Sequence, residues 1–105
     1  MDYGSSEFDK ALIEVARQVL CEGAESVLLG DRKYPVHKTP SKGLREVDFE
    51  FEGATYRGIE QNPNTNSRWA QLARKGAKVM QILQAGRYVA VVVNGEVTHY
   101  SAKKK

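Results

Sequence analysis

The chain has 105 residues, of which 41% are hydrophobic and 28% are charged. This length predicts one folded domain over residues 1–102, followed by a disordered lysine tail at 103–105. The single cysteine, Cys21, excludes an intramolecular disulfide and a cysteine-rich zinc site. No apolar run approaches the roughly 18 residues of a membrane span and no signal peptide is recognisable, so we expect a cytoplasmic protein with no metal or other cofactor.

The formal net charge is +3, and the three lysines at the end of the chain account for it. Residues 1–60 carry eight basic and twelve acidic side chains, whereas residues 61–95 carry five basic side chains and no acidic one. The acid-free stretch indicates a cationic face for an anionic partner. A segment made mostly of core strands would show the same scarcity of charge, so both interpretations stay open.

Residues 6–22 are predicted to form an amphipathic helix that ends at Gly23. Its apolar side chains recur at the spacing of one helical face. They are Phe8, Ala11, Leu12, Val15, Ala16, Val19 and Leu20. Cys21, at the end of this helix, is interpreted as a small, partly buried residue, because no general base lies near it in the sequence to make it a nucleophile.

Two short strands, 26–29 and 33–38, flank a turn at 30–32 and are predicted to form a hairpin. Pro35 cannot donate a backbone hydrogen bond, so we expect the second strand to lie at a sheet edge or to leave the sheet.

Polar and apolar residues alternate over 45–51, and this pattern predicts a half-buried strand. A two-residue turn at Glu52 and Gly53 would return the chain through a second strand over 54–61. The resulting register places aromatic and oppositely charged residues across from one another, as strand pairs favour. The predicted pairs are Phe49 with Tyr56, Asp48 with Arg57 and Arg45 with Glu60.

The C-terminal third is predicted to be a three-stranded meander over 77–84, 87–93 and 96–100. A regular register puts Gln81, Tyr88, Ala90, Val92, Val97 and His99 on one face. It puts Met80, Ile82, Val89, Val91 and Tyr100 on the other. Both faces are largely apolar, so we expect the meander at the centre of the fold, covered by the first helix on one side. The sheet curling over, or a partner subunit, would cover the other side.

The predicted fold class is therefore α+β. An N-terminal amphipathic helix packs on a mostly antiparallel sheet of about six or seven short strands, and a second short helix precedes the meander.

That second helix lies in the segment 62–78, where a polar loop leads into a helix capped by Asn66 or Ser67 and ended by Gly76. The segment combines four bases and one tryptophan with a helix N-terminus, a combination that suits an anion. The candidate anion-binding residues are Asn64, Asn66, Ser67, Arg68, Trp69, Arg74, Lys75 and Lys78. The alternative is that Trp69 anchors the core and the bases are merely solvated.

The leading hypothesis is a small, non-enzymatic binding module that holds an anionic partner on this segment. Single-stranded nucleic acid is the sharpest version, with Tyr34 or Trp69 stacking on bases, and an acidic protein is another possible partner. The alternative hypothesis is a protein-interaction or homodimerising module. An enzyme is disfavoured, because no catalytic motif is present and His99 is interpreted as a hydrogen-bonded strand residue.

Overall fold

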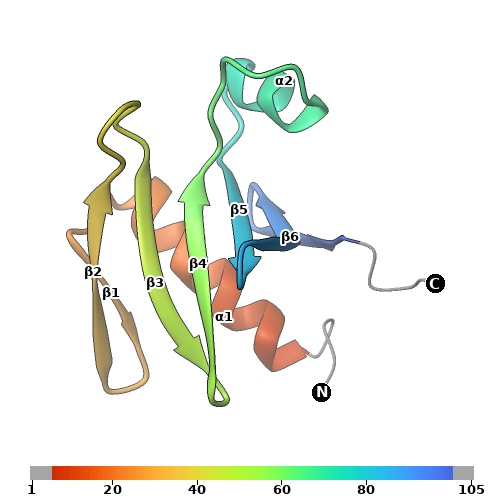
Figure 1. Ribbon diagram of the computed structural model, residues 1–105. Coiled ribbons are helices and arrows are strands. Elements are labelled where there is room, and N and C mark those ends of the chain that lie inside the picture. The colour runs from red at the N-terminus through yellow and green to blue at the C-terminus, as the bar shows by residue number, and fades with distance from the viewer. Residues whose placement is uncertain (1–5, 101–105) are drawn as a thin grey trace.

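The computed structural model describes residues 6–100, which form two helices and an antiparallel sheet of seven strands (Figure 1). The N-terminal helix is α1 (Ser6–Ala16), continued by the π-helical turn η1 (Arg17–Cys21), and the second helix is α2 (Arg68–Arg74). The strands are β1 (Ser26–Leu29), β2 (Arg32–Lys38), β3 (Arg45–Phe51), β4 (Ala54–Glu60), β5 (Val79–Gln84), β6 (Arg87–Val93) and β7 (Glu96–His99). The predicted α+β fold is confirmed, and the predicted tail at 103–105 lies outside the described residues.

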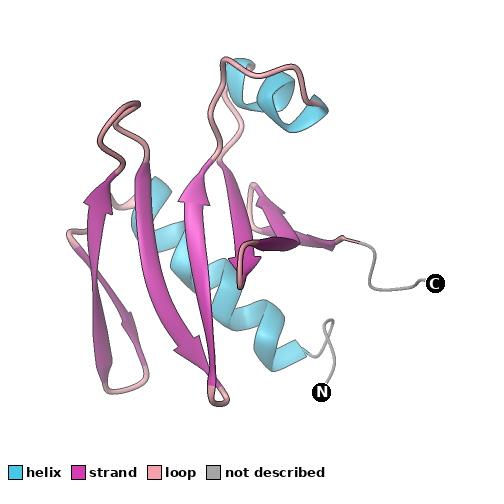
Figure 2. Cartoon of the chain, in the orientation of Figure 1, coloured by secondary structure: helices cyan, strands magenta, loops and turns pink. Residues whose placement is uncertain are grey.

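The strands follow one another across the sheet in chain order, from β1 at one edge to β7 at the other. Each pair is antiparallel, and α1 lies across one face of the sheet (Figure 2). The helix α2 stands beyond one end of β4 and β5, between which it is inserted in the chain. No helix among residues 6–100 is both long enough and apolar enough to cross a membrane.

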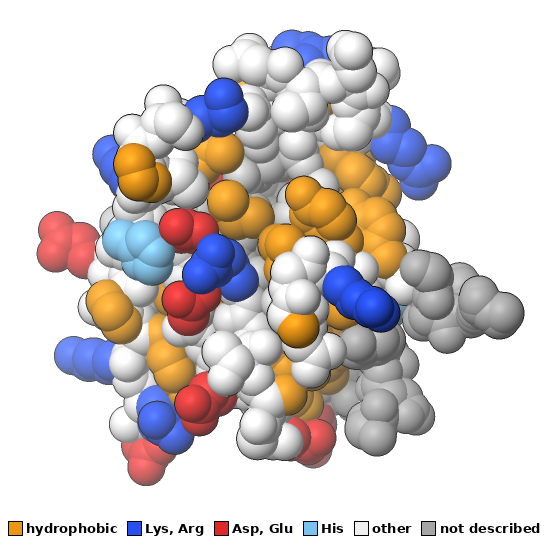
Figure 3. All heavy atoms as spheres, in the orientation of Figure 1, with side chains coloured by type: hydrophobic (Ala, Val, Ile, Leu, Met, Phe, Trp, Pro, Cys, Tyr) orange, Lys and Arg blue, Asp and Glu red, His pale blue; other side chains and the backbone are white. Residues whose placement is uncertain are grey.

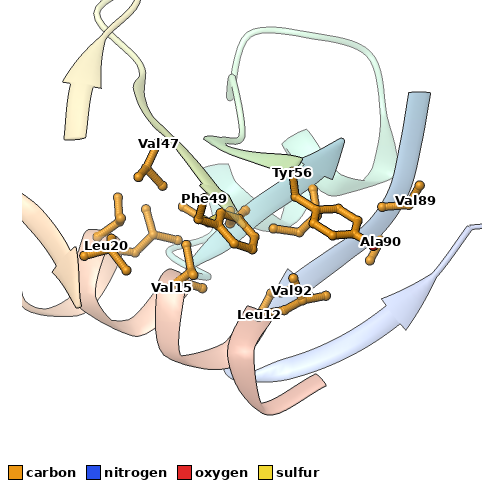
Figure 4. Packing of buried hydrophobic residues seen from close by; sticks show 14 of the residues in the cluster. Leu12, Val15, Leu20, Val47, Phe49, Tyr56, Val89, Ala90 and Val92 are labelled. Carbon is orange, nitrogen blue, oxygen red and sulfur yellow. The ribbon is translucent and has the colours of Figure 1, made fainter. Parts of the chain in front are cut away.

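The main core lies between α1 and the sheet. Leu12 and Val15, on the predicted apolar stripe, are fully buried, and they lie among side chains of the sheet such as Phe49 and Val92 (Figure 4). Burying one side chain of this size contributes about 1.5–3 kcal/mol, so this face is the main source of stability. The predicted helix is confirmed, with its last turn widened to the π form. Cys21, at the end of η1, is exposed, so the expectation that it is partly buried was wrong.

The β3–β4 hairpin has the predicted register. Phe49 faces Tyr56 and Asp48 faces Arg57, while the Arg45 guanidinium donates to the Glu60 carboxylate. The turn residues Glu52 and Gly53 have φ angles of 52° and 85°. Left-handed angles at both positions are typical of a type I′ turn, which suits a two-residue hairpin.

The predicted edge position of the strand containing Pro35 was wrong, because β2 lies between β1 and β3. The strand changes partner along its length. Residues 32–35 pair with β1, and residues 36–38 pair with β3. Pro35 therefore lies where one ladder ends and the next begins, so its missing N–H is accommodated inside the sheet.

The C-terminal meander departs from the regular register at one point. Leu83 faces Tyr88, but Ile82 faces Ala90, so Val89 is the extra residue of a β-bulge. Met80 and Ile82 consequently share a face with Ala90 and Val92 and join the main core, which corrects the predicted assignment of faces.

We expected the meander at the centre of the fold, but its strands β5 to β7 form one side of the sheet. It is covered by α1 on one face and only in part on the other. The face away from α1 buries Val79 and Val91 together with Ala70 of α2. The helix α2 therefore covers part of this face, and the part around the exposed Tyr88 stays open.

Candidate functional site

The helix α2 and the loop before it are held together by local hydrogen bonds. The Ser67 hydroxyl accepts from the Ala70 N–H at 3.1 Å, which confirms Ser67 as the helix cap. At the other end of the helix, the Arg74 guanidinium donates to the carbonyl of Pro63 and, at 3.2 Å, to that of Thr65. Arg74 thus serves to fix the loop, and its donors are partly used within the chain.

The eight candidate residues do not form one site. Ser67 and Trp69 line a groove on the sheet, and the Arg68 guanidinium lies over the Trp69 ring at 4.6 Å. Lys78 lines a separate hollow beside Cys21 on the α1 side. The remaining four are exposed and do not line the groove. They are Asn64, Asn66, Arg74 and Lys75.

The groove lies on the sheet face that α1 leaves open, and its volume is about 730 Å³. Hydrophobic side chains gather on this face below α2, with Lys and Arg side chains around them (Figure 3). The loop before β3, the strands β4 to β6, α2 and the residue after β7 all contribute to the lining. Its basic, aromatic and larger apolar lining side chains include Lys42, Leu44, Trp69, Arg87, Tyr88 and Tyr100.

Three aromatic rings form a connected row in this groove. Trp69 meets Tyr100 edge-on at a centroid distance of 6.4 Å, and Tyr100 lies 5.9 Å from Tyr88. Tyr88 is 58% exposed, which is unusual for a large side chain in a strand that is paired on both sides. The row therefore begins at Trp69, beneath the Arg68 guanidinium, and ends at the exposed Tyr88.

Beneath the rings runs a chain of polar side chains. The Tyr100 hydroxyl donates to Gln81 Oε1 at 2.8 Å, and Gln81 Nε2 donates to Gln61 Oε1. Gln61 Nε2 in turn donates to the carbonyl of Asn62 at 2.8 Å. Burial raises the pKa of Tyr100, so its hydroxyl keeps its proton and remains a donor at neutral pH. Because both glutamines are buried, this chain fixes the floor of the groove.

The charges lining the groove favour an anion. Lys42 and Arg87 belong to the lining. Its one carboxylate, Glu60, accepts from the Arg45 guanidinium at 3.1 Å.

The acidic side chains of β3 are also neutralised locally. Asp48 pairs with Arg57 at 2.8 Å, and Glu50 lies 3.4 Å from Arg32. Within residues 6–100, neither Arg68 nor Arg74 forms an ion pair with the acidic β3–β4 hairpin. The positive charge of the segment 62–78 is therefore not neutralised by this hairpin.

Tyr88, Tyr100, Lys42 and Arg87 line the same groove but were not predicted from the sequence as parts of one site. The bulge explains the first two, because an extra residue at Val89 brings Tyr88 onto the face of Tyr100. The continuous apolar run of β6 has no polar alternation that would mark this bulge. Lys42 lies in the loop before β3 and Arg87 begins β6, so their meeting depends on the whole sheet.

Two other candidates lie elsewhere. Tyr34 lies under the Arg32 guanidinium at 5.8 Å and lines a hollow apart from the groove. His99 Nε2 lies 2.9 Å from Asp9 Oδ1, which ties β7 to α1 on the covered face and agrees with a hydrogen-bonded strand residue. Among residues 6–100, no three His, Cys, Asp or Glu side chains converge as metal ligands would.

No protein-family model matches the sequence, and searches of curated proteins and of solved structures return no significant match.

Proposed function

We propose that this protein is a non-enzymatic module that binds single-stranded nucleic acid in the groove on the open sheet face. The observation that carries the proposal is the row of Trp69, Tyr100 and Tyr88, which ends in an exposed ring beside Arg87. Proteins that bind single strands combine such stacking platforms with cations that follow the phosphates. The candidate site thus moves from the segment 62–78 to the sheet, with α2 as its rim.

The arrangement of charge supports a polyanion over a neutral ligand. Arg68, Arg87 and Lys42 are exposed cations on three different elements around the groove. The paired Glu60 leaves no uncompensated carboxylate in the lining. A strand laid across Tyr88 would therefore place its phosphates between separate positive charges and meet little repulsion.

The test is a titration of a fluorescein-labelled dT12 oligonucleotide by anisotropy over a series of salt concentrations. We expect binding that weakens linearly on a log–log plot, because each neutralised phosphate of a single strand contributes about −0.7 to the slope. Replacing Lys42 and Arg87 together by alanine should flatten the slope by about 1.4. The matched control is Lys10→Ala with Lys33→Ala, two exposed lysines outside the groove, which should leave the slope unchanged.

The result that contradicts the proposal is equal loss of binding, or none, in both double variants. A homodimer that covers the groove is the alternative raised by the sequence. It predicts a mass that rises with concentration in sedimentation and falls back in Tyr88→Ala, with no binding of dT12. That pattern would replace nucleic acid by a second copy of the chain as the occupant of the groove.

A further inference from the structure

Most of the neutral polar side chains that line the groove bond to one another or to the backbone beside them. Gln61 donates to Asn62 and accepts from Gln81, and Gln81 accepts from Tyr100. Both the oxygen and the nitrogen of each glutamine amide are thereby engaged.

The loop side of the lining is occupied in the same way. The Asn62 amide oxygen accepts from the Asn64 N–H at 2.9 Å, and the Thr65 hydroxyl lies 3.4 Å from the Asn62 carbonyl. The Ser67 hydroxyl caps α2. These hydrogen bonds hold the loop in shape, so a ligand that claimed them would unfold part of the groove.

The main groups left for a ligand are ring faces and full positive charges, beside the Tyr88 hydroxyl and the Asn62 amide nitrogen. A base is distinguished from another base by paired donors and acceptors at its edge, such as a glutamine amide bonded to adenine through both atoms. Ribose is distinguished from deoxyribose by a hydrogen bond to the 2′-hydroxyl. Stacking on Tyr88 and charge on Arg87 offer neither distinction, because every base has a ring face and every nucleotide a phosphate.

We infer that the groove recognises single-strandedness itself, accepting any base sequence and either sugar. This inference rests on the proposed function and names its substrate class. A duplex is excluded for the same reason, since its bases are stacked on one another and offer no free face to Tyr88. The side chain that confers this selectivity is Tyr88, and its hydroxyl is not required.

The experiment compares dT12, dC12 and U12 with a 12-base-pair DNA duplex in the anisotropy assay at one salt concentration. We expect the three single strands to bind within about threefold of one another and the duplex at least about tenfold more weakly. Tyr88→Ala should weaken all three single strands by a similar factor of about tenfold or more, whereas Tyr88→Phe should bind like the parent. Thermal unfolding of both variants checks that the fold is kept.

Three results would overturn the inference. A preference of tenfold or more for one base, lost in Gln81→Met, would show that the amides read base edges and would leave the proposed function standing. A tenfold preference between dT12 and U12 would show that the sugar or the thymine methyl is read. Binding of no nucleic acid by the folded parent would overturn both this inference and the proposed function.

Discussion

The two faces of β5 differ in kind. Met80 and Ile82 lie on the face toward α1, are fully buried, and belong to the apolar main core. Gln81 is almost as deeply buried on the opposite face, but there it joins a hydrogen-bonded chain to Tyr100. One face holds the fold together by close packing, while the other holds a few rings and charges in place above a polar floor. The comparison teaches that burial on the open face serves the shape of the groove more than the stability of the chain.

The largest expected effect comes from breaking the covered face. Leu12→Ala should lower the free energy of unfolding by about 2–5 kcal/mol, because it leaves a cavity where Leu12 is fully buried against the sheet. The matched change on the open face, Leu83→Ala, should lower it by less than Leu12→Ala does, because Leu83 is only partly buried. Urea unfolding of both variants measures the difference. Equal losses would mean that the two faces contribute alike.

A second, smaller effect tests how closely β4 approaches the covered core. A Cβ at Gly58 would lie 2.9 Å from Met80 Sδ and 3.5 Å from Val15 Cγ1. We expect Gly58→Ala to destabilise the fold by about 1–3 kcal/mol, since an overpacked core must shift its neighbours. In the Met80→Val background, Gly58→Ala should destabilise the fold by less than it does in the parent. Thermal unfolding of the four proteins of this double-mutant cycle measures the difference. A simple sum of the two losses would show that Gly58 and Met80 are not in contact.

The fold followed from the sequence wherever local pattern and turn chemistry agreed. The β3–β4 register was predictable because the Glu52–Gly53 turn and the Phe49–Tyr56 pair demand the same alignment. The helix α1 was predictable for a similar reason, because apolar residues at its spacing share one face of a helix. In each case two independent signals pointed to one structure.

The candidate site was only partly predictable, because it depends on features that leave no local signal. Of the predicted residues, Ser67 and Trp69 line the groove and Arg68 lies over Trp69, whereas the prediction centred the site on the segment 62–78 and the proposal centres it on the sheet. The location of the groove depends on a bulge at Val89. The bulge lies in a continuous apolar run, in which no polar residue distinguishes one register from the other. Lys78 was also predicted to belong to the site, but it lies on the α1 side, where it lines a hollow with Cys21. It directly precedes β5, so its position is set by the point at which this strand enters the sheet.

The smallest effect concerns the link between the two faces at Arg45. Its guanidinium donates to the Val19 carbonyl of η1 at 2.7 Å on the covered side and to Glu60 at the groove. Burial raises the pKa of Glu60, but the hydrogen bonds and charge of Arg45 lower it by more, so the net pKa lies below its ordinary value of 4.5.

A carboxylate whose pKa is lowered by folding adds stability above its ordinary pKa and loses it as the pH falls through the folded pKa. The parent should therefore exceed Glu60→Gln in stability at about pH 6, by about 1 kcal/mol or less for a partly exposed pair. The gap should close as the pH falls below the ordinary carboxyl range, and Arg45→Met should remove the same pH-dependent part. Urea unfolding at several pH values measures this gap. A gap that stays constant with pH would show that Arg45 holds η1 alone, and that the groove's carboxylate plays no part in joining the faces.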